Sequence, residues 1–213
     1  MFITNPDAKN SCRGIKRSNH AELKINLPTR YLTFFQFLGE WYEIERFPTW
    51  YERNSKCAYK RLQYCARNVE IEHIYIKDEI QFVLHLNSSH ALGDEAIFSI
   101  QENTIDPVGI PLSVITSDYT NYAVLYGCKY IEDLDIKYLQ AWILSRTPSL
   151  SEDTLLKAYH ELNAIPYANV GYLEKVSHEE QDCTFYWTAH IKAENITEAA
   201  RIELLTRDIY NFL

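Results

Sequence analysis

The chain has 213 residues, of which 46% are hydrophobic and 14% aromatic, and its formal net charge is -8 at pH 7. These values predict one globular domain with a core large enough to fold alone, and they exclude a disordered chain. The acidic balance argues against a nucleic-acid partner, which needs a basic face. The sequence contains no run of about 18 apolar residues, so no transmembrane helix is predicted.

The first 30 residues predict an irregular arm, because Pro6 and Pro28 interrupt regular structure there. Its basic side chains indicate a solvated face rather than a binding patch. They are Lys9, Arg13, Lys16, Arg17, Lys24 and Arg30. The opening MFITNPDAKNSC lacks a charged start followed by an apolar stretch, so no secretory leader is visible.

Short strands separated by polar turns follow. A turn of helix over 31–38 precedes a strand at 40–47, in which alternation places Trp41, Glu43, Glu45 and Phe47 on one face. Further strands are predicted at 57–65, 69–76, 79–86, 93–100, 111–116, 122–130 and 137–146. Sequential strands of this kind predict an all-β fold, an antiparallel up-and-down barrel. The stretch between Gly93 and Asp118 is short, so one strand is expected to be either truncated or absent.

A helix is predicted over 150–163, capped either by Ser149 with Glu152 or by Ser151. Its apolar stripe suits packing on the outside of a barrel. Residues 168–176 predict one more strand. The end of the chain, NITEAARIELLTRDIYNFL, predicts an amphipathic helix that could dock on the barrel, meet another subunit or stay loose. We therefore expect an N-terminal arm at 1–30, a barrel domain at 31–183 and a helical extension at 184–213.

Three motifs occur in a fixed order along the barrel region: FLGEWYEIERFP at 37–48, TSDYTNYAVLYGC at 116–128 and AWILSRTPSLSED at 141–153. Together they resemble the signature of the lipocalins, in particular the branch of apolipoprotein D, bilin-binding protein and Lazarillo. The resemblance covers residues 31–183. It implies an eight-stranded antiparallel barrel with a C-terminal α-helix packed outside, and a cavity for a small apolar molecule.

The resemblance gives the motif residues structural roles. Trp41 would plug the closed end of the barrel, with the guanidinium group of Arg146 stacked on its ring. Gly39 would let the chain turn into the strand, and Asp118 would order the neighbouring turn. The chain has five cysteines, and the resemblance implies the disulfides Cys12–Cys128 and Cys57–Cys183. In this pairing Cys65 has no partner within the chain.

If Arg146 points inward, a period of two places other residues of its strand in the cavity. The expected ligand-binding residues are Tyr138, Gln140, Trp142 and Leu144 on this strand, with Leu125, Lys129, Leu112, Val114, His73 and Tyr75 on others. Asn87, in the triplet Asn87-Ser-Ser, is a candidate glycosylation site in an expected hairpin turn.

The resemblance predicts a secreted, extracellular protein that binds and transports a small hydrophobic ligand such as a bilin, retinoid, sterol or fatty acid. No enzymatic activity, cofactor or metal site is predicted. Two alternatives stay open. One is a surface or partner-interaction protein of Lazarillo type, whose C-terminal helix supports weak membrane-surface contact or self-association. The other is a lipocalin-fold isomerase that uses the thiolate of Cys65.

Overall fold

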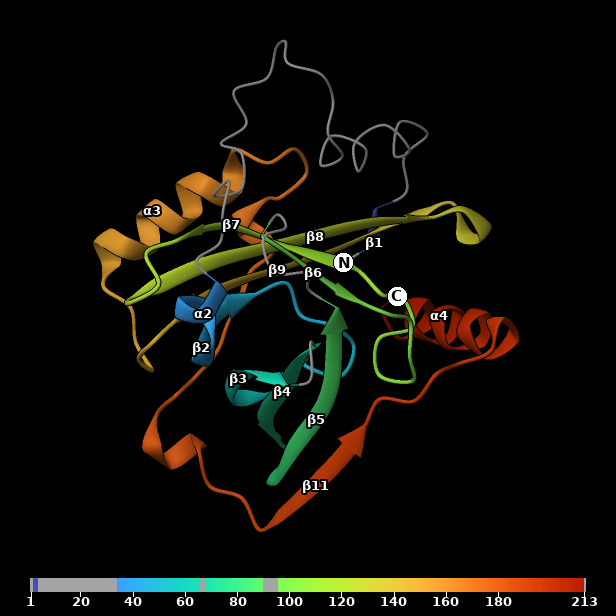
Figure 1. Cartoon of the computed structure of the whole chain (residues 1–213), viewed down its shortest axis with the longest axis horizontal. Helices are drawn as coiled ribbons and strands as arrows, with labels where there is room; N and C mark the ends of the chain where they lie inside the picture. Colours follow the sequence, from blue (N-terminus) through green and yellow to red (C-terminus); the bar gives the residue numbers. More distant parts are fainter. Residues whose placement is uncertain (1, 4–33, 66–67, 90–95, 213) are drawn as a thin grey trace.

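A computed structural model of the chain describes residues 2–3, 34–65, 68–89 and 96–212. Eight strands, β2 to β9, pair antiparallel with their neighbours in sequence, and β9 also pairs with β2, which closes a barrel (Figure 1). The strands are β2 (Gly39–Arg46), β3 (Lys56–Cys65), β4 (Asn68–Lys77), β5 (Ile80–Ser89), β6 (Ile97–Ile100), β7 (Pro111–Ser117), β8 (Tyr122–Ile131) and β9 (Ile136–Ser145). The predicted all-β antiparallel barrel is confirmed.

A β-bulge between Glu43 and Glu45 shifts the register of β2 against β9. Before the bulge, Trp41 packs in the core inside the barrel. After it, Arg46 is buried and bonds to Glu43, whereas Phe47 packs in a second core beneath the outer helix. The predicted alternation is therefore wrong for Glu45 and Phe47, because one extra residue exchanges the two faces of a strand.

The helix α3 (Glu152–Asn163) lies across the outer side of β7 and β8, as Figure 1 shows. Ser151 is its N-cap and accepts a hydrogen bond from the N–H of Thr154, at 3.4 Å. The Tyr159 hydroxyl donates to Glu45, 2.7 Å away. Burial and this carboxylate raise the pKa of Tyr159 to about 12. The bulge thus turns Glu45 toward the helix that closes the outer core.

The predicted strand at 168–176 is instead the short 3-10 helix η3 (Val170–Tyr172) followed by β10 (Glu174–Lys175), which pairs with β2. Other short elements are β1 (Phe2–Ile3), α2 (Phe34–Phe37), η2 (Glu132–Leu134) and η4 (Glu180–Asp182). β1 pairs with β9. Within the described part of the chain, no helix combines the length and apolar character needed to cross a membrane.

The barrel wall is weakest between β5 and β6. β6 has four residues, so of the two predicted alternatives the strand is truncated and not absent, and it pairs with β5 at Ser88 and Ser89. The free part of β5, from Ile80 to His85, pairs instead with β11 (Trp187–Lys192). This pairing is parallel and brings a segment of the C-terminal extension to the outer edge of the wall (Figure 1).

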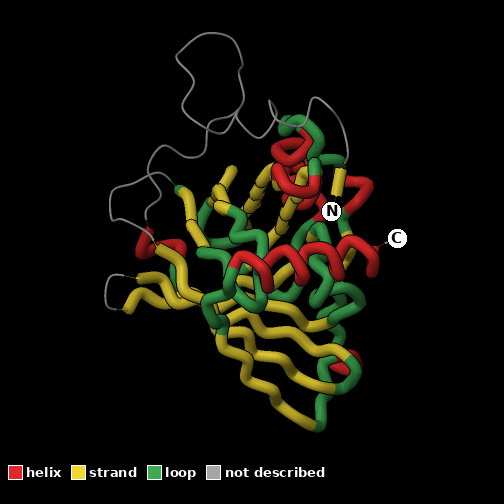
Figure 2. Tube along the Cα trace, turned by 90° about the vertical axis from the view of Figure 1, so that its right-hand side faces the viewer, coloured by secondary structure: helices red, strands yellow, loops and turns green. Residues whose placement is uncertain are grey.

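After β11 the chain crosses to the loop that follows β6. Asn195 forms a bridge with Asn103 there, and the N–H of Thr104 donates to the carbonyl of Glu194 at 2.9 Å. The helix α4 (Glu198–Phe212) then lies across this side of the molecule (Figure 2). Leu205 of α4 is buried in the barrel core. The sequence left open whether this helix docks on the barrel, meets another subunit or stays loose, and in the structure α4 docks on the barrel.

Candidate functional site

The closed end of the barrel is organised around Arg146. Its guanidinium carbon lies 3.7 Å from the centroid of the Trp41 ring. Its nitrogens donate to four carbonyl oxygens, those of Gln36, Leu38, Glu40 and Tyr119, over 2.7–3.0 Å. One side chain thus joins α2, the start of β2 and the turn before β8, and so seals this end.

Gly39 and Asp118 complete the closed end. Gly39 has a φ of +96°, and a Cβ atom there would lie 3.3 Å from Arg146 Nη1, so the position favours glycine. Asp118 Oδ1 accepts hydrogen bonds from the N–H groups of Thr120, Asn121 and Tyr122. Burial alone would raise the pKa of Asp118, but these bonds and one from the Asn121 side chain outweigh it, and the pKa is lowered.

A cavity of about 40 Å³ lies inside the barrel. That is room for a few water molecules, so a larger occupant requires lining side chains to move apart. Six of the expected ligand-binding residues line it: His73, Leu112, Leu125, Gln140, Trp142 and Leu144. Its other lining residues are Phe37, Tyr51, Lys60, Leu62, Ile71, Leu86, Phe98, Ile100 and Asp106.

The other four expected residues lie elsewhere. Tyr138 and Val114 are buried in the surrounding core. Tyr75 stacks on Phe82, with ring centroids 5.3 Å apart. Lys129 Nζ pairs with Glu102 at 2.6 Å and donates to the carbonyl of Val108. The long lysine side chain therefore ties down the loop after β6 and does not line the cavity.

A buried cluster of charged side chains borders the cavity, and sequence reasoning missed most of it. Lys60 Nζ lies 2.5 Å from Glu43 Oε1 and 3.8 Å from Glu52 Oε1. His73 Nε2 lies 3.0 Å from the same Glu43 oxygen, and Arg46 donates to the other one at 2.8 Å. Burial would raise the pKa of Glu43, but the nearby Lys60, His73 and Arg46 hold it well below its ordinary value.

The cluster also fixes the loop between β2 and β3. Arg46 donates to the carbonyls of Glu52 and Ser55, at 2.7 and 3.2 Å, and Glu52 Oε2 accepts from the Thr49 hydroxyl at 2.7 Å. A sequence signal for Lys60 exists, because it alternates with the buried Ala58 and Leu62 of β3. No comparable signal marks Arg46, which the bulge turns inward.

The donor atoms of Glu43, Glu52 and His73 lie within 4.8 Å of one another, so among the described residues these three are candidates for holding a metal ion. The ammonium group of Lys60 stands among them and lies 4.5 Å from the centroid of the Trp142 ring. The positive charge that two buried carboxylates require is thus supplied by Lys60 and Arg46.

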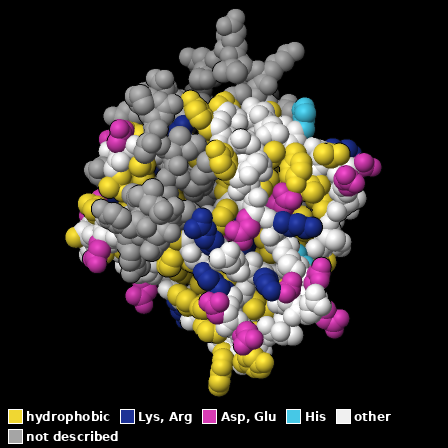
Figure 3. Space-filling model, turned by 180° about the vertical axis from the view of Figure 1, so that it is seen from behind, with side chains coloured by type: hydrophobic (Ala, Val, Ile, Leu, Met, Phe, Trp, Pro, Cys, Tyr) yellow, Lys and Arg dark blue, Asp and Glu magenta, His cyan; other side chains and the backbone are white. Residues whose placement is uncertain are grey.

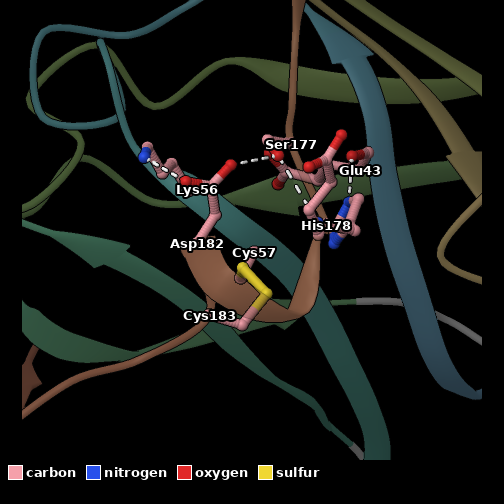
Figure 4. The surroundings of a disulfide bond; sticks show 8 residues. Glu43, Lys56, Cys57, Ser177, His178, Asp182 and Cys183 are labelled. Atoms are coloured by element: carbon pink, nitrogen blue, oxygen red, sulfur yellow. Dashed lines mark hydrogen bonds and ion pairs between the residues drawn. A yellow bond between two sulfur atoms is a disulfide. The ribbon is translucent and has the colours of Figure 1, made fainter.

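The predicted disulfide Cys57–Cys183 is confirmed, with a Cα–Cα distance of 5.6 Å (Figure 4). Around it, Lys56 pairs with Asp182 at 2.5 Å, and Ser177 donates to the same carboxylate at 2.6 Å. These contacts fasten the segment before the C-terminal extension to β3. Cys12 lies outside the described residues, so the bridge Cys12–Cys128 stays a prediction.

Two other predicted sites are placed only in part. Asn87 is exposed but lies within β5, opposite Glu70, so its expected position in a hairpin turn is wrong. The reason is that β5 continues to Ser89. Cys65 ends β3, and its side chain lies outside those that the structure describes.

Residues 38–175 match the lipocalin / cytosolic fatty-acid binding protein family. The chain belongs to this family. The match includes the first motif from its second residue, the other two motifs and α3, and it ends before β11 and α4. β11 and α4 therefore lie outside the matched residues.

Relatives from insects and mammals are similar to this chain. Insecticyanin-A of Manduca sexta is 24% identical over 125 residues, which is 55% of this chain and 65% of the relative. Bilin-binding protein of Pieris brassicae is 24% identical over 117 residues, 53% of this chain and 61% of the relative. Apolipoprotein D of Bos taurus is 31% identical over 134 residues, which is 56% of this chain and 64% of the relative. The similarity thus spans less than two thirds of each relative.

Solved structures agree on the fold. The structure of insecticyanin from Manduca sexta covers 78% of this chain and 91% of its own, with 19% identity and a TM-score of 0.63. Lobster apocrustacyanin A1 covers 70% of this chain and 81% of its own, with 19% identity and a TM-score of 0.60. At this identity the likeness concerns the barrel architecture alone.

Proposed function

We propose that this lipocalin binds and carries a small hydrophobic ligand inside its barrel. The observation that supports this best is the composition of the cavity wall. Seven of its lining side chains are aliphatic: Leu62, Ile71, Leu86, Ile100, Leu112, Leu125 and Leu144. Apolar walls with a few polar groups are typical of sites for small apolar molecules. The similarity to bilin-binding protein supports the same ligand class.

A polar group on the wall narrows the ligand chemistry. Trp142 lines the cavity, and its Nε1–H is buried, with no hydrogen-bond acceptor among the described residues. A buried donor without an acceptor costs roughly 1–3 kcal/mol. An apolar ligand with a carbonyl, carboxylate or hydroxyl oxygen would supply that acceptor. Bilins, retinoids, sterols and fatty acids all carry such an oxygen.

Calorimetric titration with biliverdin, retinol, cholesterol and palmitate tests the proposal. We expect at least one of them to bind with one molecule per chain. Leu112→Phe adds volume to the cavity wall and should weaken that ligand by roughly tenfold or more. Leu156→Phe, on the exposed face of α3, is the matched control and should leave binding unchanged.

Two results would contradict the proposal: no binding by any of the four probes, or equal binding by Leu112→Phe and the wild type. Trp142→Phe keeps an aromatic ring and removes the N–H. It should weaken a ligand that accepts this hydrogen bond by roughly fivefold to tenfold. An unchanged affinity in Trp142→Phe would refute the acceptor but leave the cavity assignment intact.

Secretion is also part of the proposal. The disulfide Cys57–Cys183 supports it, because such bonds persist in oxidising compartments. We expect the protein in the medium of the cells that produce it, with Cys57 and Cys183 resistant to alkylation before reduction. Recovery in the cytosol with both thiols free would contradict this assignment.

A further inference from the structure

Three consecutive aromatic side chains stand in solvent at the start of β11. Phe185, Tyr186 and Trp187 are 43%, 76% and 74% exposed, and we call them the aromatic tip. The N–H of Tyr186 donates to the carbonyl of Glu79 at 2.9 Å, which holds the tip against the turn between β4 and β5. Figure 3 shows hydrophobic side chains projecting from the lower end of the molecule, where β11 begins in Figure 1.

The aromatic tip continues into an apolar face of the sheet. The parallel register pairs Trp187 with Ile80, Ala189 with Phe82, and Ile191 with Leu84. Directly paired residues lie on the same face of a sheet, and on β5 this is the face whose Leu84 is buried in the barrel core. Ile191 is 39% exposed, so the face passes gradually from solvent into the core.

The opposite face of β11 is polar, which separates the two sides of this strand. Thr188 donates to Gln81 at 3.4 Å, and His190 Nδ1 lies 3.0 Å from His85 Nε2. β11 is therefore amphipathic, with its apolar side turned the same way as the interior of the barrel. The aromatic tip is thus continuous with an apolar face that leads along β11 and β5 toward the barrel core, and a chance run of exposed aromatic residues would not need such a face.

Shape and charge indicate what covers the tip. Tyr186 and Trp187 are three-quarters exposed, and Figure 3 shows hydrophobic side chains projecting at this end, which suits insertion into a lipid phase better than docking on a flat protein surface. Tyrosine and tryptophan combine an apolar body with a polar edge, and they are enriched where lipid meets water. The adjacent turn carries Asp78 and Glu79, and the whole chain has a net charge of -8, which disfavours anionic headgroups.

We propose that the aromatic tip docks this protein on a lipid–water interface of zwitterionic headgroups. The apolar face of β11 and β5 then leads from that interface to the barrel core. This inference goes beyond ligand binding in the cavity, because docking requires no occupant there. It also gives the C-terminal extension a role in addition to covering the free edge of β5.

Flotation of the full chain with phosphatidylcholine vesicles tests the inference. We expect the wild type to float with the vesicles, and the double variant Tyr186→Ser/Trp187→Ser to lose roughly tenfold or more in partition coefficient. Leu156→Ser, which removes a 57% exposed leucine on α3, is the matched control and should float like the wild type. The cavity variant Leu112→Phe should also float normally, so failure of docking and failure of cavity binding can be distinguished.

Several outcomes would overturn the inference. They are no flotation of the wild type, equal flotation of the double variant, and an equal loss in Leu156→Ser. Dimers in analytical ultracentrifugation that the double variant disperses, without vesicle binding by the wild type, would assign the tip to a second copy of this chain. A preference for phosphatidylserine vesicles that salt abolishes would overturn the zwitterionic assignment.

Discussion

The closed end of the barrel and the seam between β5 and β6 are built in different ways. At the closed end, Arg146 satisfies four carbonyl oxygens and stacks on Trp41, which has no exposed surface. At the seam, two residue pairs join β5 to β6, and the rest of the β5 edge pairs with β11, a distant segment of the chain. Side chains of the family motifs hold one region, and backbone pairing with a distant segment holds the other.

This difference predicts that the two regions respond to different substitutions. Changes at the motif residues should lower the stability of the closed end and of the whole barrel. Changes in the extension or its disulfide should act mainly at the seam. Hydrogen exchange resolves the two, because amides of weakly held regions exchange through local opening.

The largest effect is expected from removal of the disulfide. The double variant Cys57→Ser/Cys183→Ser should lose about 4–5 kcal/mol in the free energy of unfolding by the chain-entropy model, because the bond joins residues separated by 126 positions. Urea denaturation measures the loss. Amides of β11 should exchange faster than those around Trp41. A loss below about 1 kcal/mol, or earlier opening of the closed end, would contradict the comparison.

Arg146→Ala should lower the free energy of unfolding by about 3 kcal/mol, because it leaves carbonyl oxygens without donors and removes the contact with Trp41. Arg146→Lys should recover only part of this loss, because the ammonium group keeps the charge and can donate hydrogen bonds but lacks the planar fork of the guanidinium group. Arg61→Ala is the control of the same residue type. Arg61 forms partly exposed ion pairs with Glu40 and Glu72, each worth at most about 1 kcal/mol. Equal losses in Arg146→Ala and Arg61→Ala would contradict the assigned role.

Leu205→Ala should cost about 2–3 kcal/mol, because Leu205 is 1% exposed within the barrel core. Ile202→Ala, on the same helix but 39% exposed, should cost less than about 1 kcal/mol. In Leu205→Ala, exchange of the β5 amides from Ile80 to His85 should accelerate while the closed end stays protected. Uniform acceleration across both regions would show that the seam is not a separate weak point.

The smallest effect concerns Asp118 at the closed end. In the folded state the pKa of Asp118 is lowered from its ordinary value of 3.8. The ionised carboxylate therefore stabilises the fold fully at pH values above 3.8, and this contribution is lost as the pH falls through the folded-state pKa. Because Asp118 is exposed, the free energy of unfolding of the wild type should exceed that of Asp118→Asn by at most about 0.5 kcal/mol at neutral pH. Urea unfolding at several pH values measures the difference. A difference that grows on acidification would contradict the sign.

Much of the barrel could be predicted from the sequence, because its strands alternate and its turns are polar. The strand predicted at 122–130 is β8, which ends at Ile131. On β9, a period of two counted from Arg146 correctly predicts that Gln140, Trp142 and Leu144 face the cavity. Ser151 was one of two predicted caps for α3 and forms the hydrogen bond. These features depend on residues close together in sequence or on the spacing of a motif.

Other features escaped prediction for physical reasons. The bulge in β2 exchanges the faces of Glu45 and Arg46, and no residue type signals it. β11 alternates apolar and polar residues, but most of its side chains are exposed, so the alternation does not indicate which part of the barrel it pairs with. Its parallel pairing with β5 depends on an edge left open by the shortness of β6, which lies about 90 residues earlier in the chain.

Native mass spectrometry of the protein purified from its natural source tests the central claim most directly. We expect a complex with one small apolar molecule per chain, which the Leu112→Phe variant from the same source retains poorly. A wild-type chain that carries no such molecule, and that gains none when incubated with an apolar extract of that source, would contradict the claim that the barrel interior binds a hydrophobic ligand.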